Sequence, residues 1–371
     1  MIAAVDFPPD PRIERYIKVL LEKKFKVDVL CLKGDGSKNW ESARIFRLPF
    51  SQLTLPKPLN WIIEYLLFLF LGTIATYILT LRERYAIIHY HNPPDFNLPF
   101  LFPLKFLGTK LIYDVHETTH LLTLSRLRNT HFAKFIAFIT VQFMKLSLIT
   151  ADLTITVNEF TKKELNKFVP DAEIIVIPNI PDIDPRTIPS VKRDSNKMIF
   201  IHAGNLLPNA DLFTLMKAAK HFEKEAIFWI AGDGPLRKEL EKIAPKNVIF
   251  LGKLPHLVLL SYLKSADAAL VTAEDTPHNR YATPCRAYEA AALGKPIVAA
   301  KLPGIISLLK DSCIYYIPQN VESLSDAIQM LLDPKNVKSH SKKIKKYFVQ
   351  NYSWNKIKSI LQNVYGELNV S

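Results

Sequence analysis

Short apolar runs alternate with amphipathic stretches along the whole chain, and this alternation limits the fold more than any other feature. The runs are rich in Val, Ile and Leu, as expected of strands buried on both faces of a parallel sheet. We predict strands at 26–32, 86–91, 110–115, 153–157, 173–177, 197–204, 226–232, 247–252, 268–273 and 295–300. Helical patterns separate them at 12–24, 160–168, 209–222, 235–243 and 257–265. Repeated strand–helix units predict an α/β fold with helices on both faces of parallel sheets.

The alternation is interrupted between residues 178 and 197, where four prolines and several polar residues exclude regular structure. A chain of 371 residues is long enough for two domains. We therefore predict two doubly wound Rossmann-like domains at 1–180 and 181–352, facing a cleft. Residues 1–5 fit a short first strand, and a helix at 353–371 is expected to pack back on the first domain. A cleft between two such domains is a natural ligand site.

The composition is that of a globular protein, with 49% hydrophobic and 22% charged residues, which excludes a disordered chain. The net charge of +13 predicts an anionic partner: a nucleic acid, an acidic membrane surface or a phosphate-bearing substrate. No aromatic-basic strand signature or recognition helix supports nucleic acid. Cys31, Cys285 and Cys313 lie far apart, which favours a reducing compartment over a disulfide framework. The first 15 residues lack signal-peptide features, so we expect a cytoplasmic protein.

Two apolar segments suggest contact with a membrane surface. Residues 65–81 carry no charge, but the strands predicted on either side belong to one sheet, which a membrane span would separate. We therefore expect a buried or in-plane interfacial helix. Residues 132–150 place Lys134, Gln142 and Lys145 on one helical face, a pattern that also suits an ordinary core helix. The two segments favour a peripheral protein on the inner face of an anionic cell membrane. The lysine-rich tail at 335–358 fits a solvated basic helix face better than a site for anionic lipid.

The motif TPCRAYEAAALGKP carries the most chemical information. Thr283 suits an N-cap, Pro284 the first helical residue and Gly294 the end of the helix. The N-terminus of this helix offers an anion site, to which Arg286 adds a fixed positive charge. Glu289, one turn further, suits hydrogen bonds from sugar hydroxyls. The motif predicts a site for a diphosphate with an attached ribose, although Arg286 and Glu289 also suit a surface ion pair.

Several ordered motifs resemble the retaining, GT-B-fold glycosyltransferases of family four. They are FPPDPRIERYIKVLLEKKFKVDVLCL, HYHNPPDFNLP, KLIYDVHE, ADLTITVNEFTKKEL with VIPNIPD, and the C-terminal set AGDGPLRKELEK, NVIFLGKLP, ADAALV and TPCRAYEAAALGKPIVA. The resemblance covers nearly the whole chain. It implies a GT-B fold and transfer of a hexose from a nucleotide-diphosphate sugar to an acceptor hydroxyl, with retention and without a metal or other cofactor. Because the apolar segments lie in the acceptor domain, we expect a lipid-linked or membrane-proximal glycan as acceptor.

The resemblance assigns roles to matching positions in the second domain. Glu289 matches the second glutamate of the paired-glutamate motif, which holds the donor ribose. Tyr281 stands where the first glutamate, near the transferred sugar, is expected. Leu254 and His256 fall where the nucleobase packs.

The diphosphate clamp of the family departs from its usual pattern. Asn205 and Asp211 stand at the places of the usual Arg and Lys. Arg286, or Arg280 just upstream, must then supply the positive charge, helped by the helix N-terminus.

The resemblance implies three groups of site residues, in which His116 matches the cleft histidine near the reacting sugar. The catalytic residues are His116, Arg286 and Glu289; the donor-binding residues are Asn205, Gly234, Leu254, His256, Tyr281, Thr283, Pro284 and Cys285; the acceptor-binding residues, on first-domain loops, are Asp10, Arg12, Asn92 and Glu117.

Competing functions remain open at this stage. Residues 116–120, HETTH, satisfy the zinc-hydrolase pattern through His116, Glu117 and His120, but His116 would sit at a strand end before any helix begins. His89 and His91 are not expected to add ligands, because alternate strand residues point to opposite faces. The missing clamp and Tyr281 favour a nucleotide-sugar-binding protein with impaired catalysis. A GT-B epimerase or phosphorylase is a further alternative.

Overall fold

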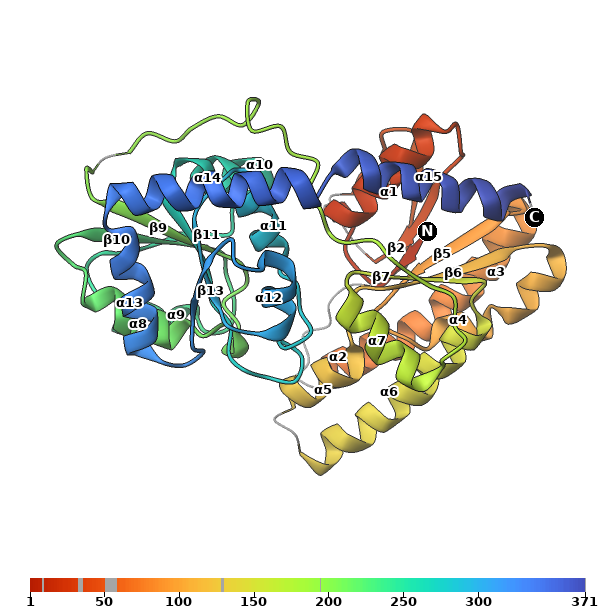
Figure 1. Cartoon of the computed structure of the whole chain (residues 1–371). Helices are drawn as coiled ribbons and strands as arrows, with labels where there is room; N and C mark the ends of the chain where they lie inside the picture. The colour runs from red at the N-terminus through yellow and green to blue at the C-terminus, as the bar shows by residue number, and fades with distance from the viewer. Residues whose placement is uncertain (9, 33–35, 51–58, 128–129, 194, 371) are drawn as a thin grey trace. The chain divides into compact units, whose positions relative to one another are not determined.

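The computed structural model forms two compact units (Figure 1). It describes residues 1–8, 10–32, 36–50, 59–127, 130–193 and 195–370. The first unit combines Met1–Pro178 with Asn355–Ser371, and the second is Asn179–Trp354. The boundaries expected from the sequence lie at 180 and 353. Both units contain a sheet of parallel strands, so the predicted α/β class is confirmed.

Within the described residues, the first unit holds an eight-stranded sheet in the order β3-β4-β2-β1-β5-β6-β7-β8. Its pairings are parallel except for β3 with β4. The strands are β1 (Ile2–Ala3), β2 (Asp28–Cys31), β3 (Asn39–Trp40), β4 (Ala43–Arg47), β5 (Ile87–His91), β6 (Lys110–Val115), β7 (Leu153–Thr156) and β8 (Ile174–Val176). The register pairs His91 with Asp114, which brings polar side chains of β5 and β6 to the same end of the sheet.

The second unit, in its described part, holds a six-stranded parallel sheet in the order β11-β10-β9-β12-β13-β14. The strands are β9 (Met198–Ala203), β10 (Ala226–Ala231), β11 (Val248–Gly252), β12 (Ala268–Val271), β13 (Ile297–Ala300) and β14 (Ile314–Tyr316). Strands β12 and β13 are buried along their whole length, which explains their continuous apolar sequence.

Helices connect the parallel strands in both units. Those of the first unit are α1 (Pro11–Glu22), α2 (Leu59–Leu67), η1 (Phe68–Gly72), α3 (Thr73–Glu83), α4 (Asn97–Phe100), η2 (Phe102–Leu107), α5 (Thr119–Arg126), α6 (His131–Thr150), α7 (Glu159–Phe168) and α15 (Trp354–Val370). Those of the second are η3 (Pro208–Ala210), α8 (Leu212–Lys220), α9 (Arg237–Ile243), α10 (His256–Ser265), α11 (Cys285–Ala292), α12 (Pro303–Leu309), α13 (Val321–Leu331) and α14 (Pro334–Asn351).

The ten strands predicted from apolar runs are all present, with ends trimmed by up to two residues. Strands β3, β4 and β14 were not predicted. Strand β4 has the sequence ARIFR, whose two arginines and alternating exposure hide an apolar run. Strands β3 and β14 span two and three residues, too few to show a pattern.

Helix α11 begins one residue later than the sequence predicted. Pro284, not Thr283, is its N-cap, because the ψ of Pro284 is 132° and leaves that residue extended. Gly294 follows the helix with a φ of +67°, a conformation that favours glycine at this end.

The two apolar segments of the first unit carry large side chains on their outer faces. On the segment from η1 to α3, the buried positions include Phe68, Gly72, Thr76 and Thr80, whereas Phe70, Ile74, Ile78 and Leu81 are exposed. We call the exposed set the outward apolar surface: Phe70, Ile74, Ile78 and Leu81; Phe100, Phe102, Phe106 and Leu107; Phe132, Phe135, Phe138, Leu146 and Ile149.

Contacts join the elements that carry the outward apolar surface. The hydroxyl of Tyr77 on α3 donates to the carbonyl of Phe100 on α4, at 2.7 Å. The ring of Phe100 contacts Phe143 on α6, with centroids 6.4 Å apart. Lys105 of η2 donates to the carbonyl of Thr150 at the end of α6.

Among the described residues, two helices are long and apolar enough to cross a membrane, judged by length and composition: Ile63–Glu83 and His131–Thr150. Only 22% and 28% of their most apolar stretches are buried. Each helix is nevertheless flanked by strands of the same sheet, β4 and β5 for one and β6 and β7 for the other. The chain therefore returns to the same sheet after each helix, as the sequence predicted for the first segment.

Candidate active site

In the first unit, the predicted site residues gather at the carboxyl ends of β5 and β6, the edge where parallel sheets build sites. Asn92 follows β5 and is buried. Its Oδ1 accepts hydrogen bonds from the backbone N–H groups of His116, at 2.6 Å, and Glu117, at 3.2 Å. Its Nδ2 donates to Asp95 and to the carbonyl of Glu117, both at 2.8 Å. Asn92 thus fixes the loop that presents His116.

Asp114, the fully buried carboxylate of β6, lies beneath this loop. Arg12 donates to both of its oxygens, from Nε at 3.0 Å and from Nη2 at 2.8 Å. The Nε2 atoms of His89 and His116 lie 3.2 Å and 3.1 Å from its Oδ2. Burial alone would raise the pKa of Asp114, but the charge of Arg12 and these hydrogen bonds outweigh burial and hold that pKa well below its usual range. Asp114 is therefore an ionised acceptor.

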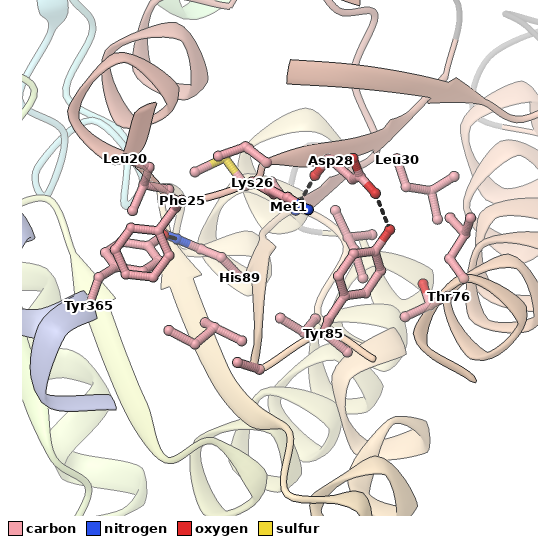
Figure 2. A pocket seen from close by; sticks show the side chains of 16 residues that line it. Met1, Leu20, Phe25, Lys26, Asp28, Leu30, Thr76, Tyr85, His89 and Tyr365 are labelled. Carbon is pink, nitrogen blue, oxygen red and sulfur yellow. Dashed lines mark hydrogen bonds between the residues drawn. The ribbon is translucent and has the colours of Figure 1, made fainter. Parts of the chain in front are cut away.

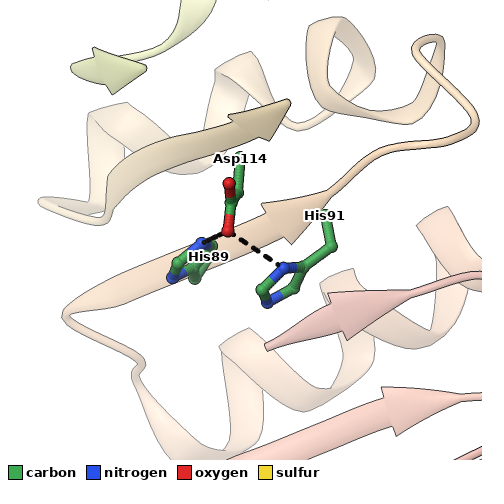
Figure 3. Close-up of side chains that lie close together, drawn as sticks. All are labelled: His89, His91 and Asp114. Atoms are coloured by element: carbon green, nitrogen blue, oxygen red, sulfur yellow. Dashed lines mark hydrogen bonds and ion pairs between the residues drawn. The ribbon is translucent and has the colours of Figure 1, made fainter. Parts of the chain in front are cut away.

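His89 and His91 lie side by side on β5 next to this carboxylate (Figure 3). Their rings stack with centroids 4.3 Å apart. Two residues apart on a strand means the same face, so the expectation that they diverge was wrong. Burial lowers the pKa of both imidazoles, and the neighbouring His89 lowers that of His91 further. Both are therefore neutral at pH 7.

Three side chains here could bind a metal ion, but Arg12 already occupies the carboxylate among them. Among the described residues, ligand atoms of His89, His91 and Asp114 lie within 4.8 Å of one another. The guanidinium of Arg12 already bonds both oxygens of Asp114, and a second cation beside it in a buried site would be repelled. The geometry fits an ion pair braced by histidines, not a metal centre.

The HETTH motif does not assemble a zinc site. His116 follows β6 directly, before α5 begins at Thr119, as the sequence indicated. His120 lies in the first turn of α5 with its Nε2 3.8 Å from Glu164 of α7. His116 and His120 thus engage different partners on different elements, and nothing in this arrangement supports the zinc-hydrolase alternative.

The residues predicted to contact the acceptor have different positions from those expected. Arg12 lies in α1, not in a loop, and is 5% exposed; Asn92 is 3% exposed. Both are engaged within the protein: Arg12 bonds Asp114, and Asn92 holds the loop of His116. Asp10 caps α1 through hydrogen bonds from the N–H groups of Arg12 and Ile13. Glu117 is half-buried beside His116.

In the second unit, two glycine-containing loops meet backbone to backbone at the carboxyl ends of β9 and β10. A Cβ on Gly232 would overlap the carbonyl oxygen of Gly204, and one on Gly234 would lie 2.6 Å from that of Leu206. Gly204 and Gly232 also have φ values of +150° and +147°. The predicted donor residue Asn205 is exposed on the first loop. These glycines allow a close approach that no larger residue would permit.

Arg286 reaches this pair of loops from the first turn of α11. Its Nη2 donates to the carbonyl of Thr272 at 2.8 Å, and its Nη1 would lie 2.7 Å from a Cβ on Gly204. Its Nε has no hydrogen-bond partner. Burial lowers the pKa of this guanidinium, but arginine keeps its charge at neutral pH. The cation therefore lies beside the loop where the family clamp is absent.

The residues predicted for the ribose and the nucleobase are brought together. Nε2 of His256, the first residue of α10, lies 2.8 Å from Oε1 of Glu289 on α11. Glu289 thus pairs with His256. The alternative drawn from the sequence was a surface ion pair of Glu289 with Arg286. The segments before these two helices hold half-buried residues that were also predicted to bind the donor: Leu254, Tyr281, Thr283 and Pro284. Cys285 is exposed at the start of α11.

Asp211, at the other clamp position, turns inward. It is 3% exposed, and its Oδ2 accepts from the hydroxyl of Tyr316 and the N–H of Gln319, both at 2.9 Å. Burial raises the pKa of this carboxyl. Asp211 is therefore held by hydrogen bonds within the second unit.

Sequence reasoning missed the polar centre around Asp114. Asp114 stood within a predicted buried strand, where a charge requires a partner. That signal was available, but its partner Arg12 is 102 residues away. Tyr365 on α15, which donates to His89, had no such signal.

A pocket of about 130 Å³ lies at the amino ends of β1, β2 and β5 (Figure 2). Its lining includes Leu30, Phe25, Tyr85, His89 and Tyr365. It opens at the edge of the sheet opposite His116, so it is not the predicted acceptor site.

Two family models match the chain in sequence order. The model described as Glycosyltransferase Family 4 matches residues 12–184, and the model described as Glycosyl transferases group 1 matches residues 184–349. The two matches meet in the segment that follows the first unit.

Two uncharacterized glycosyltransferases of Methanocaldococcus jannaschii are relatives. One is 28% identical over 183 residues, 47% of this chain and 45% of the relative. The other is 22% identical over 232 residues, 61% of this chain and 62% of the relative. The chain therefore spans less than two thirds of the length of each of these relatives.

Solved structures resemble the whole chain. Anabaena Alr3699/HepE in complex with UDP has a TM-score of 0.72 at 16% identity, over 99% of this chain and 98% of that one. The E. coli trehalose-6-phosphate structure bound with UDP-2-fluoro glucose has a TM-score of 0.71 at 13% identity and the same coverage. WaaG, a glycosyltransferase involved in lipopolysaccharide biosynthesis, has a TM-score of 0.65 at 10% identity, over 98% of each chain. At these identities the likeness establishes the fold.

Proposed function

Because the chain belongs to the GT-B glycosyltransferases of family four, we propose that it transfers a hexose from a nucleotide-diphosphate sugar to an acceptor hydroxyl with retention. The observation that carries the proposal is the guanidinium of Arg286 beside the Gly204 loop, at the start of α11. This cation and the helix N-terminus lie together where a diphosphate is needed in such an enzyme.

The second unit supplies the groups that would stabilise the leaving diphosphate. As the C1–O bond breaks, negative charge grows on the phosphate oxygens. Arg286 is already held by Thr272, and α11 has no side-chain cap at Pro284, so the positive groups need little rearrangement. Glu289, one turn along α11, is the group we assign to the attached ribose, and His256 lies beside it. The acceptor oxygen forms the new bond to C1 from the same face, the departing phosphate takes its proton, and the proposed step uses no metal.

Uridine diphosphate is the first donor nucleotide to test, because the structural neighbours hold UDP and a UDP sugar. We expect UDP to bind the purified protein in isothermal titration calorimetry. Hydrolysis or transfer from UDP-hexoses, followed by UDP release, tests catalysis separately. Binding without turnover in the presence of any acceptor would favour the impaired binding protein, to which Asn205 and Tyr281 point. Absence of binding to UDP, GDP and ADP would contradict the proposed function.

We also propose that the acceptor is lipid-linked and that the protein works peripherally on the inner, anionic face of the cell membrane. The outward apolar surface supports this proposal, because helix α3 buries Thr76 and Thr80 while Ile78 is 59% exposed and Leu81 63% exposed. In water, exposing these apolar side chains is unfavourable, whereas at the surface of a bilayer they can be buried among the lipids. On the same elements, Arg82 and Lys134 suit anionic headgroups.

Vesicle flotation tests this surface. We expect binding to vesicles of phosphatidylcholine with phosphatidylglycerol, and weaker binding to phosphatidylcholine alone. Full burial of one Phe or Ile side chain contributes about 1.5–3 kcal/mol. The double variant Phe70→Ser with Ile78→Ser should therefore reduce binding by at least about tenfold. The control is Ile243→Ser with Met330→Ser, which removes side chains 49% exposed on the second unit. Equal binding by the two double variants would contradict the proposed surface.

A further inference from the structure

His116 is attached at one ring nitrogen and open at the other. Its Nε2 lies 3.1 Å from Oδ2 of Asp114 and its backbone N–H donates to Asn92. Because an ionised carboxylate only accepts, Nε2 must carry the proton. Nδ1 makes no hydrogen bond to any described residue, and it is not among the buried unpartnered atoms. The side chain is 20% exposed. In the neutral form of the ring, Nδ1 is therefore a bare acceptor.

The same oxygen of Asp114 selects the tautomer of His89. Nε2 of His89 lies 3.2 Å from it and must also carry a proton. Nδ1 of His89 is then an acceptor inside the core, where an unpaired acceptor is costly. The hydroxyl of Tyr365 donates to it. Figure 2 shows Tyr365 on its helix next to His89, on the wall of the pocket. Tyr365, His89, Asp114 and His116 thus form one chain of hydrogen bonds.

His91 offers one competing arrangement of protons. Its Nδ1 lies 3.0 Å from Nε2 of His116 and 3.3 Å from Oδ2 of Asp114. If His91 donated to Nε2 of His116, the proton of His116 would move to Nδ1. The bare Nε2 would then face an ionised oxygen at 3.1 Å, which is repulsive. Arg12 holds Asp114 ionised from α1, and Tyr16 of the same helix packs against His89 and His91. In the first arrangement Nδ1 of His91 is bare and accepts from Nε2 of His116, and the proton lies on the shorter of the two contacts to Oδ2, at 3.1 Å against 3.3 Å.

We propose that Tyr365, His89 and Asp114 are positioning residues that fix His116 as its Nε2–H tautomer, so that Nδ1 accepts a hydrogen bond from a substrate hydroxyl. The proposal rests on the proposed function for the presence of a substrate at His116. It gives helix α15 a role beyond packing, since α15 starts in the connection from the second unit and supplies the hydroxyl that completes the chain. Docking of α15, also tied to α1 through Lys358 and Glu22, becomes a condition for the correct acceptor atom.

Nitrogen-15 NMR of the histidine rings in the full chain tests the proposal without any substrate. The variant His116→Gln assigns the signals. At pH 7.5 we expect His116 to show a protonated Nε2 and a bare Nδ1. A protonated Nδ1 on His116 would overturn the proposal. Because this readout needs no activity, it separates failure of the proposal from failure of the proposed transferase function.

Kinetics then test the link to α15. Tyr365→Phe should lower kcat by about two- to tenfold, the value of one neutral hydrogen bond, with the donor KM unchanged. The same variant should show a mixture of His116 tautomers. Tyr347→Phe is the matched control, because it removes a hydroxyl that donates to the carbonyl of Leu308 in the second unit. Unchanged His116 signals in Tyr365→Phe, or an equal fall in kcat for Tyr347→Phe, would overturn the link. His116→Gln should lose activity more strongly than Tyr365→Phe.

Discussion

Removal of the Arg286 charge is the sharpest test of the donor site, because two arginines near α11 were candidates for the missing clamp. Arg286 uses one N–H group on Thr272, while its Nε has no partner and its Nη1 lies beside the Gly204 loop. Arg280 bonds both oxygens of Asp275, at 2.5 Å and 2.9 Å, and its side chain is 57% exposed. The free donors of Arg286 favour it as the diphosphate ligand.

The expected loss follows from these contacts. A hydrogen bond to a charged group contributes about 1.5–3 kcal/mol, so Arg286→Gln should weaken UDP binding by roughly 10- to 150-fold. Arg286→Lys should fall between this variant and the wild type, because it keeps the charge but loses the planar fork. Arg280→Gln should bind UDP within about twofold of the wild type, because an exposed ion pair contributes little.

Isothermal titration calorimetry measures the three affinities, and urea unfolding checks that each variant is folded. A folded Arg286→Gln protein that binds UDP as the wild type does would refute the reasoning. A larger loss of UDP affinity in Arg280→Gln than in Arg286→Gln would indicate that Arg280 binds the diphosphate. It would also show that the ion pair of Arg280 with Asp275 breaks when the nucleotide binds.

Three further predictions concern other parts of the molecule. Burial lowers the folded-state pKa of His89 and His91, so the stability they give is present above their unfolded pKa of about 6.5 and is lost as pH falls below it. Urea unfolding should show up to about 1.4 kcal/mol lost per pH unit per histidine, and a flat profile from pH 7 to 5 would contradict this. Gly232→Ala should abolish UDP binding or prevent folding, because its Cβ meets the Gly204 carbonyl; a stable variant with normal affinity would disprove the close approach. Glu289→Ala should weaken UDP binding by about tenfold and leave inorganic diphosphate binding unchanged, which calorimetry with both ligands tests.

Local patterns were enough to predict most of the fold. Strands buried on both faces need continuous apolar runs, so β5, β6, β9 and β10 could be predicted from composition over a few residues. Strand β4 could not, because its side chains alternate between core and solvent and include Arg44 and Arg47. The start of α11 was missed by one residue because a proline suits both the N-cap and the first turn.

The candidate site was predictable where neighbouring residues carry it, as on α11, and not where distant segments meet. Arg12 and Asp114 lie 102 positions apart, and the resemblance alone placed Arg12 at the acceptor. His89 and His91 were assigned to opposite faces, although a spacing of two puts them on one face. Glu289, predicted for the ribose, contacts His256, predicted for the nucleobase. No local sequence pattern indicates that these two residues lie together.

The buried polar group formed by Arg12, Asp114, His89 and His91 lowers the stability of the first unit. This loss is an argument that the group serves a function. Burying an arginine and a carboxylate removes both from water, and a well-packed apolar pair is often as stable or more so. Asp114 is fully buried, Arg12 is 5% exposed, and Nε2 of His91 lacks a partner. A fold that needed only a core would replace these groups with Leu or Met, as it does elsewhere along β6. The groups converge at the carboxyl end of the sheet and contact the one ring nitrogen whose proton decides what His116 presents. On this reasoning a functional gain at His116 offsets the stability lost, and an apolar replacement of Arg12 and Asp114 together should yield a folded protein with little transferase activity. Loss of folding in that double variant would show instead that the ion pair is needed for the fold itself.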